Sequence, residues 1–182
     1  FNSGANTSAN AIGIISNAGS LNASSGFVVL AADQIRNTGS INAPGGQVML
    51  TAGDQATLSL SNGQLVQFTV NQNTNNLAIA SNGVIQAQDG KIVLNANATN
   101  ALLNSVINLS GVVSASGGVV AIDAGANGKV NLDTATVDVS RQGGPAGNIT
   151  MSAQEIVLAN SKLLASSTNG KGGTVILAGN SA

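Results

Sequence analysis

Four residue types are missing from this chain: cysteine, histidine, tryptophan and tyrosine. Without cysteine there are no disulfides, no thiolate metal ligands and no thiol nucleophile. Without histidine the usual base for an activated serine is missing, and no serine lies in a G-x-S-x-G sequence. The composition therefore argues against a nucleophilic hydrolase.

Charge is scarce as well, at 7% of residues with a net charge of −1. Such a chain has no basic field for nucleic acid or anionic lipid, and its three phenylalanines offer bases little stacking surface. No apolar run reaches about 18 residues, so no membrane insertion is expected. Even so, 43% of the residues are hydrophobic, which argues against disorder and favours a narrow core of Val, Ile, Leu and Ala.

What the chain does contain is a recurring phrase in two parts. The first part, I-x-x-x-G-x-Φ-x-A with Φ a branched apolar residue, occupies residues 15–23, 35–43, 79–87 and 107–115. The second part, G-x-Φ-x-Φ-x-A, occupies residues 26–32, 46–52, 90–96, 118–124 and 147–153, with an altered copy at 173–179. Self-similarity at this spacing indicates a solenoid, in which each repeat buries its apolar face against its neighbours.

Within the phrases apolar and polar residues alternate, as at Val48 and Leu50 or at Ile92 and Leu94. A period of two predicts short strands with one buried face, bounded here by Gly, Asn and Ser turns. Most junctions lack the tight two-residue turns that a sandwich of antiparallel hairpins requires. The sequence therefore predicts a parallel β-helix of six to eight coils, about 4.8 Å apart, in a rod roughly 30 to 40 Å long.

Two segments interrupt the repeats. Apolar runs within Leu58–Val70 flank Asn62-Gly63, which predicts an antiparallel β-hairpin with a type I′ turn. With the polar stretch after it, this hairpin is expected to form an extra-helical insertion over residues 56–76. Residues 96–106 lack alternation and predict a short helix or helical corner. Residues 1–182 are expected to form one domain, and the loop-like start at Phe1, without Met, indicates a piece of a longer protein.

Glycine and asparagine are expected to occupy the corners of the coils because both tolerate positive φ. Asparagines at equivalent places in adjacent coils also predict hydrogen-bonded ladders, Asn17 with Asn37 and Asn22 with Asn42. The glycine-rich stretch Arg141–Gly147 is expected to be a flexible excursion from a coil.

The phrases, the hairpin and the stretch ALLNSVINLSGV from Ala101 to Val112 together resemble filamentous haemagglutinin-type exoproteins. The likeness is to the latter part of their amino-terminal haemagglutination-activity (two-partner secretion) domain and the β-helix after it, and covers residues 14–180. It implies a right-handed parallel β-helix, exported through a dedicated barrel transporter of the Gram-negative outer membrane. The family's Asn-Pro-Asn-Gly secretion motif is absent, since Pro44 and Pro145 lie in other contexts. Contact with the transporter is therefore expected through segments outside this chain.

The tightest grouping of charged residues is Asp123, Asp133 and Asp138 with Arg141. In β-helix enzymes that cleave polysaccharides, clustered carboxylates supply acid–base chemistry or hold calcium. The alternative, which we favour, is that these residues are solvated and keep the rod soluble. We therefore assign no catalytic, cofactor-binding or metal-binding residue. Glycosylation sequons begin at Asn6, Asn22, Asn97, Asn108 and Asn148, although chance accounts for them equally well in a chain so rich in Asn and Ser.

The sequence thus predicts a non-enzymatic protein that is secreted to the bacterial cell surface. The expected role is that of an adhesin or structural shaft in adhesion or biofilm formation, with a host or matrix glycan or protein as its ligand. No nucleic-acid partner and no cofactor are expected. Two alternatives stay open. One is a self-assembling filament of head-to-tail β-helices, since open sheet ends invite pairing. The other is a polysaccharide-cleaving enzyme that uses the three aspartates.

Overall fold

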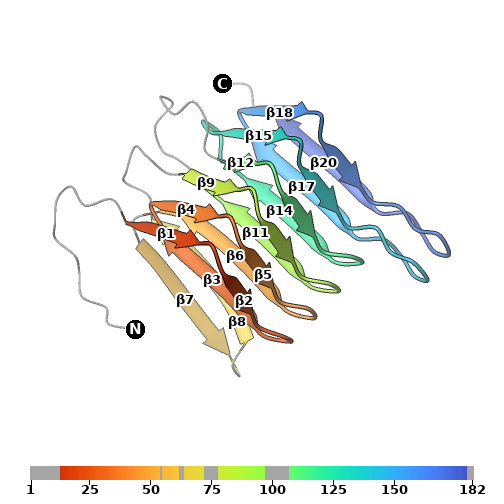
Figure 1. Cartoon of the computed structure of the whole chain (residues 1–182), viewed down its shortest axis with the longest axis horizontal. Helices are drawn as coiled ribbons and strands as arrows, with labels where there is room; N and C mark the ends of the chain where they lie inside the picture. The colour runs from red at the N-terminus through yellow and green to blue at the C-terminus, as the bar shows by residue number, and fades with distance from the viewer. Residues whose placement is uncertain (1–12, 54, 62–63, 72–77, 97–106, 180–182) are drawn as a thin grey trace.

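The part of the chain that the structure describes winds into six coils of a parallel β-helix (Figure 1). The computed structural model describes residues 13–53, 55–61, 64–71, 78–96 and 107–179. Over these residues the secondary structure consists of strands, and no helix in them could cross a membrane. Each coil contributes one strand to each of three six-stranded sheets, so the predicted fold class is confirmed.

The three sheets run the length of the solenoid, and strands from successive coils pair in parallel. The first sheet contains β1 (Ile14–Asn17), β4 (Gln34–Asn37), β9 (Ala78–Ser81), β12 (Ile107–Leu109), β15 (Lys129–Asp133) and β18 (Glu155–Ala159). The second contains β2 (Ser20–Asn22), β5 (Ser40–Asn42), β10 (Val84–Gln86), β13 (Val112–Ser114), β16 (Thr136–Asp138) and β19 (Lys162–Leu164). The third contains β3 (Phe27–Ala32), β6 (Gln47–Ala52), β11 (Lys91–Asn95), β14 (Val119–Asp123), β17 (Asn148–Ala153) and β20 (Thr174–Gly179).

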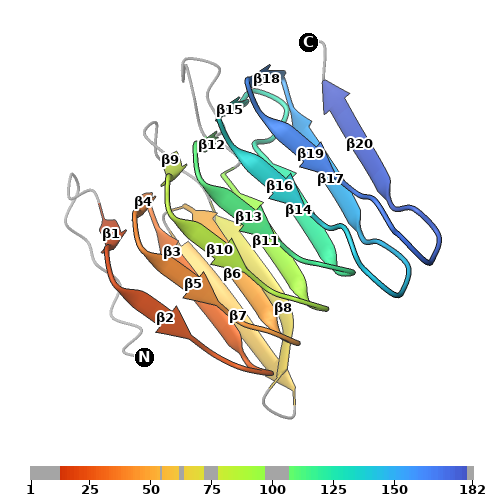
Figure 2. The same ribbon diagram turned by 45° about the vertical axis from the view of Figure 1, so that its right-hand side comes forward.

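The predicted hairpin is present and lies outside the three sheets. It consists of β7 (Gln55–Ser61) and β8 (Gln64–Asn71), which pair antiparallel with an irregularity between Ser59 and Leu60. β7 packs beside β3 at the amino-terminal end of the solenoid (Figure 2). The Asn62-Gly63 turn, the end of the predicted insertion and most of the predicted helix at 96–106 lie outside the described residues.

The core is a set of apolar columns that run through the interior of the coils. Alternate residues of each strand point inward, and parallel pairing in register places equivalent residues of successive coils on top of one another. In the first sheet the column Ile35, Ile79, Ile107 and Val130 is fully buried. In the third sheet Val48, Ile92, Val120 and Ile149 form another such column. These columns account for the alternation in the sequence.

The recurring glycines have a different cause from the one predicted. Positive φ is confirmed at the corner residues Gly45, Gly117, Gly125, Gly143 and Asn160. The second-part glycines, however, lie outside the left-handed region, and in four coils positive φ falls on the residue before them. A Cβ on Gly46 or Gly90 would collide with the carbonyl oxygen of the glycine one coil earlier. The coils therefore need glycine here because their backbones approach closely.

The predicted Asn17–Asn37 ladder is confirmed inside the first sheet. Asn17 Nδ2 donates to Asn37 Oδ1 at 2.8 Å, and Asn37 Nδ2 donates to Ser81 Oγ at 3.1 Å. Asn22 and Asn42 are register partners, but Asn22 Nδ2 donates to Ser20 Oγ at 2.9 Å. The Asn17 column is thus a buried hydrogen-bonded ladder, whereas Asn22 bonds within its own coil instead of forming the predicted ladder with Asn42.

Candidate binding groove

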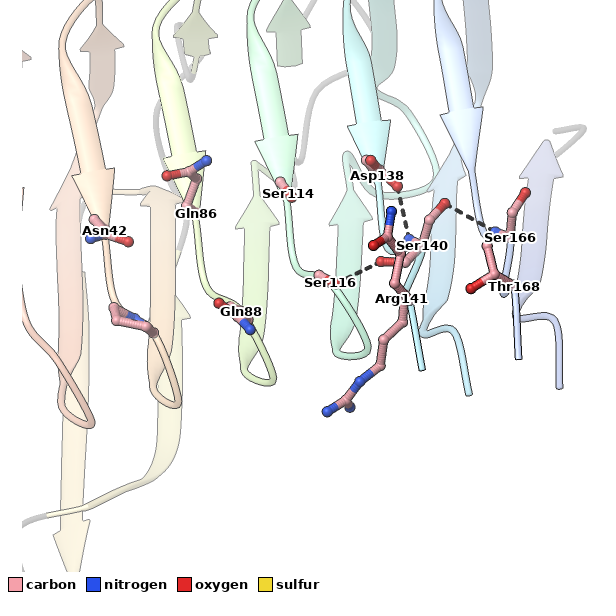
Figure 3. Close-up of a pocket in the computed structure, with 12 residues that line it drawn as sticks. Asn42, Gln86, Gln88, Ser114, Ser116, Asp138, Ser140, Arg141, Ser166 and Thr168 are labelled. Atoms are coloured by element: carbon pink, nitrogen blue, oxygen red, sulfur yellow. Dashed lines mark hydrogen bonds between the residues drawn. The ribbon is translucent and has the colours of Figure 1, made fainter. Parts of the chain in front are cut away.

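A polar groove follows the corner where the second sheet turns into the third (Figure 3). Its volume is about 840 Å³, and it extends from the second coil to the sixth. The lining residues are Asn42, Pro44, Gln86, Gln88, Ser114, Ser116, Asp138, Ser140, Arg141, Gln142, Ser166 and Thr168. Because coils lie about 4.8 Å apart, the groove is roughly 19 Å long along the solenoid axis.

Two rows of side chains make most of the lining. The first row stacks in register at the ends of strands in the second sheet and consists of Asn42, Gln86, Ser114 and Asp138. The second row comes two residues later in each coil and contains Pro44, Gln88, Ser116, Ser140 and Ser166. The residue between the rows is Ala43, Ala87, Ala115 or Val139, and each of these is buried. The same alternation that fills the core therefore directs polar side chains outward into the groove.

Hydrogen bonds hold the carboxyl-terminal part of the groove. Asp138 Oδ1 accepts from the Ser140 amide at 2.8 Å, and Ser116 Oγ donates to the Ser140 carbonyl at 2.6 Å. Ser140 Oγ accepts from the Ser166 amide at 3.0 Å, which links the fifth coil to the sixth. These contacts fix the backbone under the side chains without using all of their polar atoms.

The amino-terminal part of the groove has unused hydrogen-bonding capacity. Within the described part of the chain, the side-chain amides of Asn42, Gln86 and Gln88 form no hydrogen bond, and the latter two side chains are exposed. A primary amide offers two N–H donors and a carbonyl acceptor. Three such groups on two adjacent coils give the groove a surface that can bind a ligand by hydrogen bonds.

An ion pair crosses the rim of the groove. Arg141 Nη1 lies 2.6 Å from Asp89 Oδ1, and the pair links the fifth coil to the third. The arginine passes over Gly117 of the fourth coil, where a Cβ would lie 2.6 Å from Nη1. Figure 3 shows the guanidinium extending away from the rows of the groove. Proximity in sequence groups Arg141 with Asp138 and Asp133, whereas its ion-pair partner in the structure is Asp89.

The three aspartates that the sequence grouped together lie on different sheets. Asp123 ends β14 in the third sheet, Asp133 ends β15 in the first and Asp138 ends β16 in the second. Asp123 Oδ1 accepts from the Gly125 amide at 2.9 Å and from Ser152 Oγ at 2.8 Å. Among the described residues, no three His, Cys, Asp or Glu side chains are placed to hold a metal ion. The spacing in sequence therefore places the three carboxylates on three different sheets rather than along one sheet.

A smaller hollow of about 430 Å³ lies on the opposite side of the second sheet, at its corner with the first. Its charged lining residues are Arg36 and Asp133, and its polar ones include Asn82, Asn108 and Asn131. Of the described sequons, Asn22 and Asn148 are exposed and Asn108 is partly buried in this hollow. The hollow covers fewer coils than the polar groove and carries charge of both signs.

Comparison with known proteins adds no identity to this geometry. No family model matches the chain, and no curated protein is significantly similar to it. The resemblance to filamentous haemagglutinin-type exoproteins therefore rests on the sequence phrases and stays a proposal.

The groove itself was not predicted, although a signal for it is present in the sequence. Once the repeats are aligned, the second-sheet strands of coils two to five end in the polar residues Asn42, Gln86, Ser114 and Asp138, whereas β19 of the sixth coil ends in Leu164. Alternation identifies these side chains as outward-facing. Alternation cannot show that the turn between the second and third sheets leaves a groove beside these side chains.

Proposed function

We propose that this chain is part of the β-helical shaft of a secreted Gram-negative surface protein that acts in adhesion or biofilm formation. The observation that supports this most is the continuity of the three sheets over one apolar interior across all six coils. Because the three strands of each coil pair with those of the next coil, the rod is stiff and can hold a binding region away from the cell. The polar groove provides a surface along the shaft for glycan or protein contacts.

The proposed partners follow from the same reading. An outer-membrane transporter would act on segments outside this chain, and a host or matrix glycan or protein would contact the shaft. No catalytic role is included, because the aspartates available for acid–base chemistry lie on three sheets. The placement of the protein outside the cell rests on the sequence resemblance alone.

Two measurements on the source bacterium test this proposal. An antibody raised against the chain should label intact cells, and the released protein that it captures should be much longer than 182 residues. Beads coated with the folded chain should then adhere to host or biofilm matrix more than beads coated with a Val120→Asp variant, whose buried charge disrupts the coils. Labelling confined to permeabilised cells, or equal adherence of the two bead types, would contradict it.

A second candidate function is a self-assembling filament, and the carboxyl-terminal coil favours it. There the inward-facing Leu158, Val175 and Leu177 are 42%, 41% and 44% exposed. In the described residues nothing pairs with the outer edges of β18, β19 and β20. A second copy stacked in the internal register would place Ile15 over Ile156, which continues an apolar column.

The oligomeric state separates the two candidates. A filament subunit should form fibres at rising concentration in electron micrographs, and a Leu158→Asp, Leu177→Asp double variant should abolish them, since these side chains cover the exposed end. A chain that stays monomeric in sedimentation at high concentration rules the filament out and leaves the shaft.

A further inference from the structure

We propose that the polar groove binds an uncharged, extended polysaccharide that lies parallel to the solenoid axis. This inference rests on the proposed adhesive function and assigns it a site and a ligand class. The site is the pair of rows that contains Gln86, Gln88 and Ser114, with Asn42 at one end and Ser166 at the other.

The shape of the groove fits a polymer better than a compact molecule. It crosses five coils, and each coil repeats the same two outward positions about 4.8 Å further along the axis. That spacing is close to the advance per sugar in an extended β-linked chain. Successive sugars therefore meet side chains at matching positions of successive coils, and weak contacts add along the strand.

The chemistry of the lining matches sugar hydroxyl and acetamido groups. Side-chain amides and hydroxyls both donate and accept hydrogen bonds, and those of Asn42, Gln86 and Gln88 have no partner within the described residues. None of the lining residues is aromatic and none has a large aliphatic side chain, so an apolar ligand gains little burial there. Binding in this groove therefore comes from hydrogen bonds.

The charges of the lining favour a neutral chain over an anionic one. Asp138 is the carboxylate among the lining residues, and Arg141 is their cation. The guanidinium is held by Asp89 at 2.6 Å and extends away from the rows. A sulfated glycan or a nucleic acid would thus meet a carboxylate without a free cation to offset its charge.

The test uses the whole 182-residue chain and three uncharged probes, cellohexaose, laminarihexaose and chitohexaose, with a heparin hexasaccharide as the anionic comparison. Two-dimensional amide NMR reports backbone and side-chain amides together. At millimolar concentration, at least one uncharged probe should shift the side-chain amide signals of Asn42, Gln86 and Gln88. Heparin should leave them unchanged.

Two variants separate the groove from the rest of the surface. Gln86→Ala combined with Gln88→Ala removes two exposed amides, and the affinity for the active probe should fall about tenfold or more. Asn82→Ala is the matched control, because Asn82 is an exposed amide on the same coil that faces the smaller hollow. Its affinity should stay within about twofold of the original chain.

Three results would overturn the inference: no shift with any of the three uncharged probes, shifts centred on the smaller hollow, or tighter binding of heparin. Bead adherence keeps this outcome apart from the proposed function. If the double variant loses probe binding and its beads still adhere, the adhesive surface lies elsewhere and the shaft proposal stands. If the unsubstituted chain binds a probe but beads coated with it do not adhere, the groove is a glycan site and the adhesive role is wrong.

Discussion

The first three coils and the last three fill one interior column with different chemistry. In the first sheet this column contains Asn17, Asn37 and Ser81 in coils one to three, and then Leu109, Leu132 and Leu158 in coils four to six. Asn37 and Leu132 are both fully buried. The backbone register is the same throughout, so a single position in the coil accepts either a hydrogen-bonded ladder or an apolar stack.

The comparison shows what each solution demands. A leucine column needs close packing but no polar partner in the neighbouring coils. An amide column needs a polar partner in the coil before and in the coil after, because a buried amide without a partner is costly. Asn37 has both partners, in Asn17 and Ser81. In this column, therefore, side-chain hydrogen bonds match the amino-terminal coils to one another, and burial alone stabilises the carboxyl-terminal coils.

The largest effect is expected when amide chemistry is moved into the apolar half. Leu132→Asn removes a fully buried side chain and leaves an amide between Leu109 and Leu158, neither of which can accept or donate. The loss of cavity-filling contacts and the unsatisfied amide together should lower the free energy of unfolding by about 4 kcal/mol or more. Urea denaturation followed by circular dichroism measures it. Leu132→Met, which keeps volume, should cost less than about 1.5 kcal/mol, and equal costs would contradict the account.

The close approach of the coils extends the comparison from side chains to backbone. Gly83→Ala places a methyl group against the carbonyl oxygen of Gly39, and we expect a loss of about 3 kcal/mol because the coils must separate. Gly19 occupies the same position in the first coil, where the only contact of a Cβ with the described residues would be Asn17 Oδ1 at 4.0 Å. Gly19→Ala should therefore be nearly neutral in the same denaturation experiment. A comparable loss of stability in both variants would mean that the backbone conformation at the corner requires glycine, rather than the close approach of the neighbouring coil.

The reverse exchange should cost less than the first. Asn37→Leu leaves Ser81 Oγ without its donor, while Asn17 Nδ2 keeps its contact of 3.3 Å with the Ser40 carbonyl. We expect a loss of about 2 kcal/mol.

Adding Asn17→Leu and Ser81→Leu to that variant makes the column apolar from end to end. Since no unpaired polar group is then left in it, the triple variant should recover most of the lost stability. Failure to recover would show that the amide ladder contributes more than the satisfaction of its own groups.

The smallest effect is expected at the rim of the groove. The Asp89 and Arg141 side chains are 42% and 37% exposed, so solvent screens their attraction. Asp89→Asn keeps a residue that tolerates the observed φ of 55° and removes the charge, and it should cost less than about 1 kcal/mol. The difference should shrink further when the denaturation is repeated at high salt. A loss of several kcal/mol would mean that the ion pair between the third and fifth coils contributes substantially to the stability of the solenoid.

Periodicity was enough to predict the solenoid, since the two-part phrase marks the strands and the inward columns. The inserted hairpin followed from Asn62-Gly63 between two apolar runs. The Asn17–Asn37 ladder also followed, because both residues hold the same place in the phrase. Two features did not follow. The role of the glycines depends on the distance between backbones, and the separation of Asp123 from Asp138 depends on which sheet each strand joins. Neither quantity can be read from spacing along the chain.

The inserted hairpin has a consequence for how the molecule could be altered. Ile35 pairs with Ile79 in the same register as Ile15 with Ile35, although the hairpin lies between the first two and not the second. The number of residues between the third-sheet strand of one coil and the first-sheet strand of the next thus does not change the pairing of the coils. The entropic cost of closing a longer loop also grows only slowly with its length. A foreign segment could therefore be inserted at this corner between the third and first sheets. It would leave the groove, which lies between the second and third sheets, unchanged.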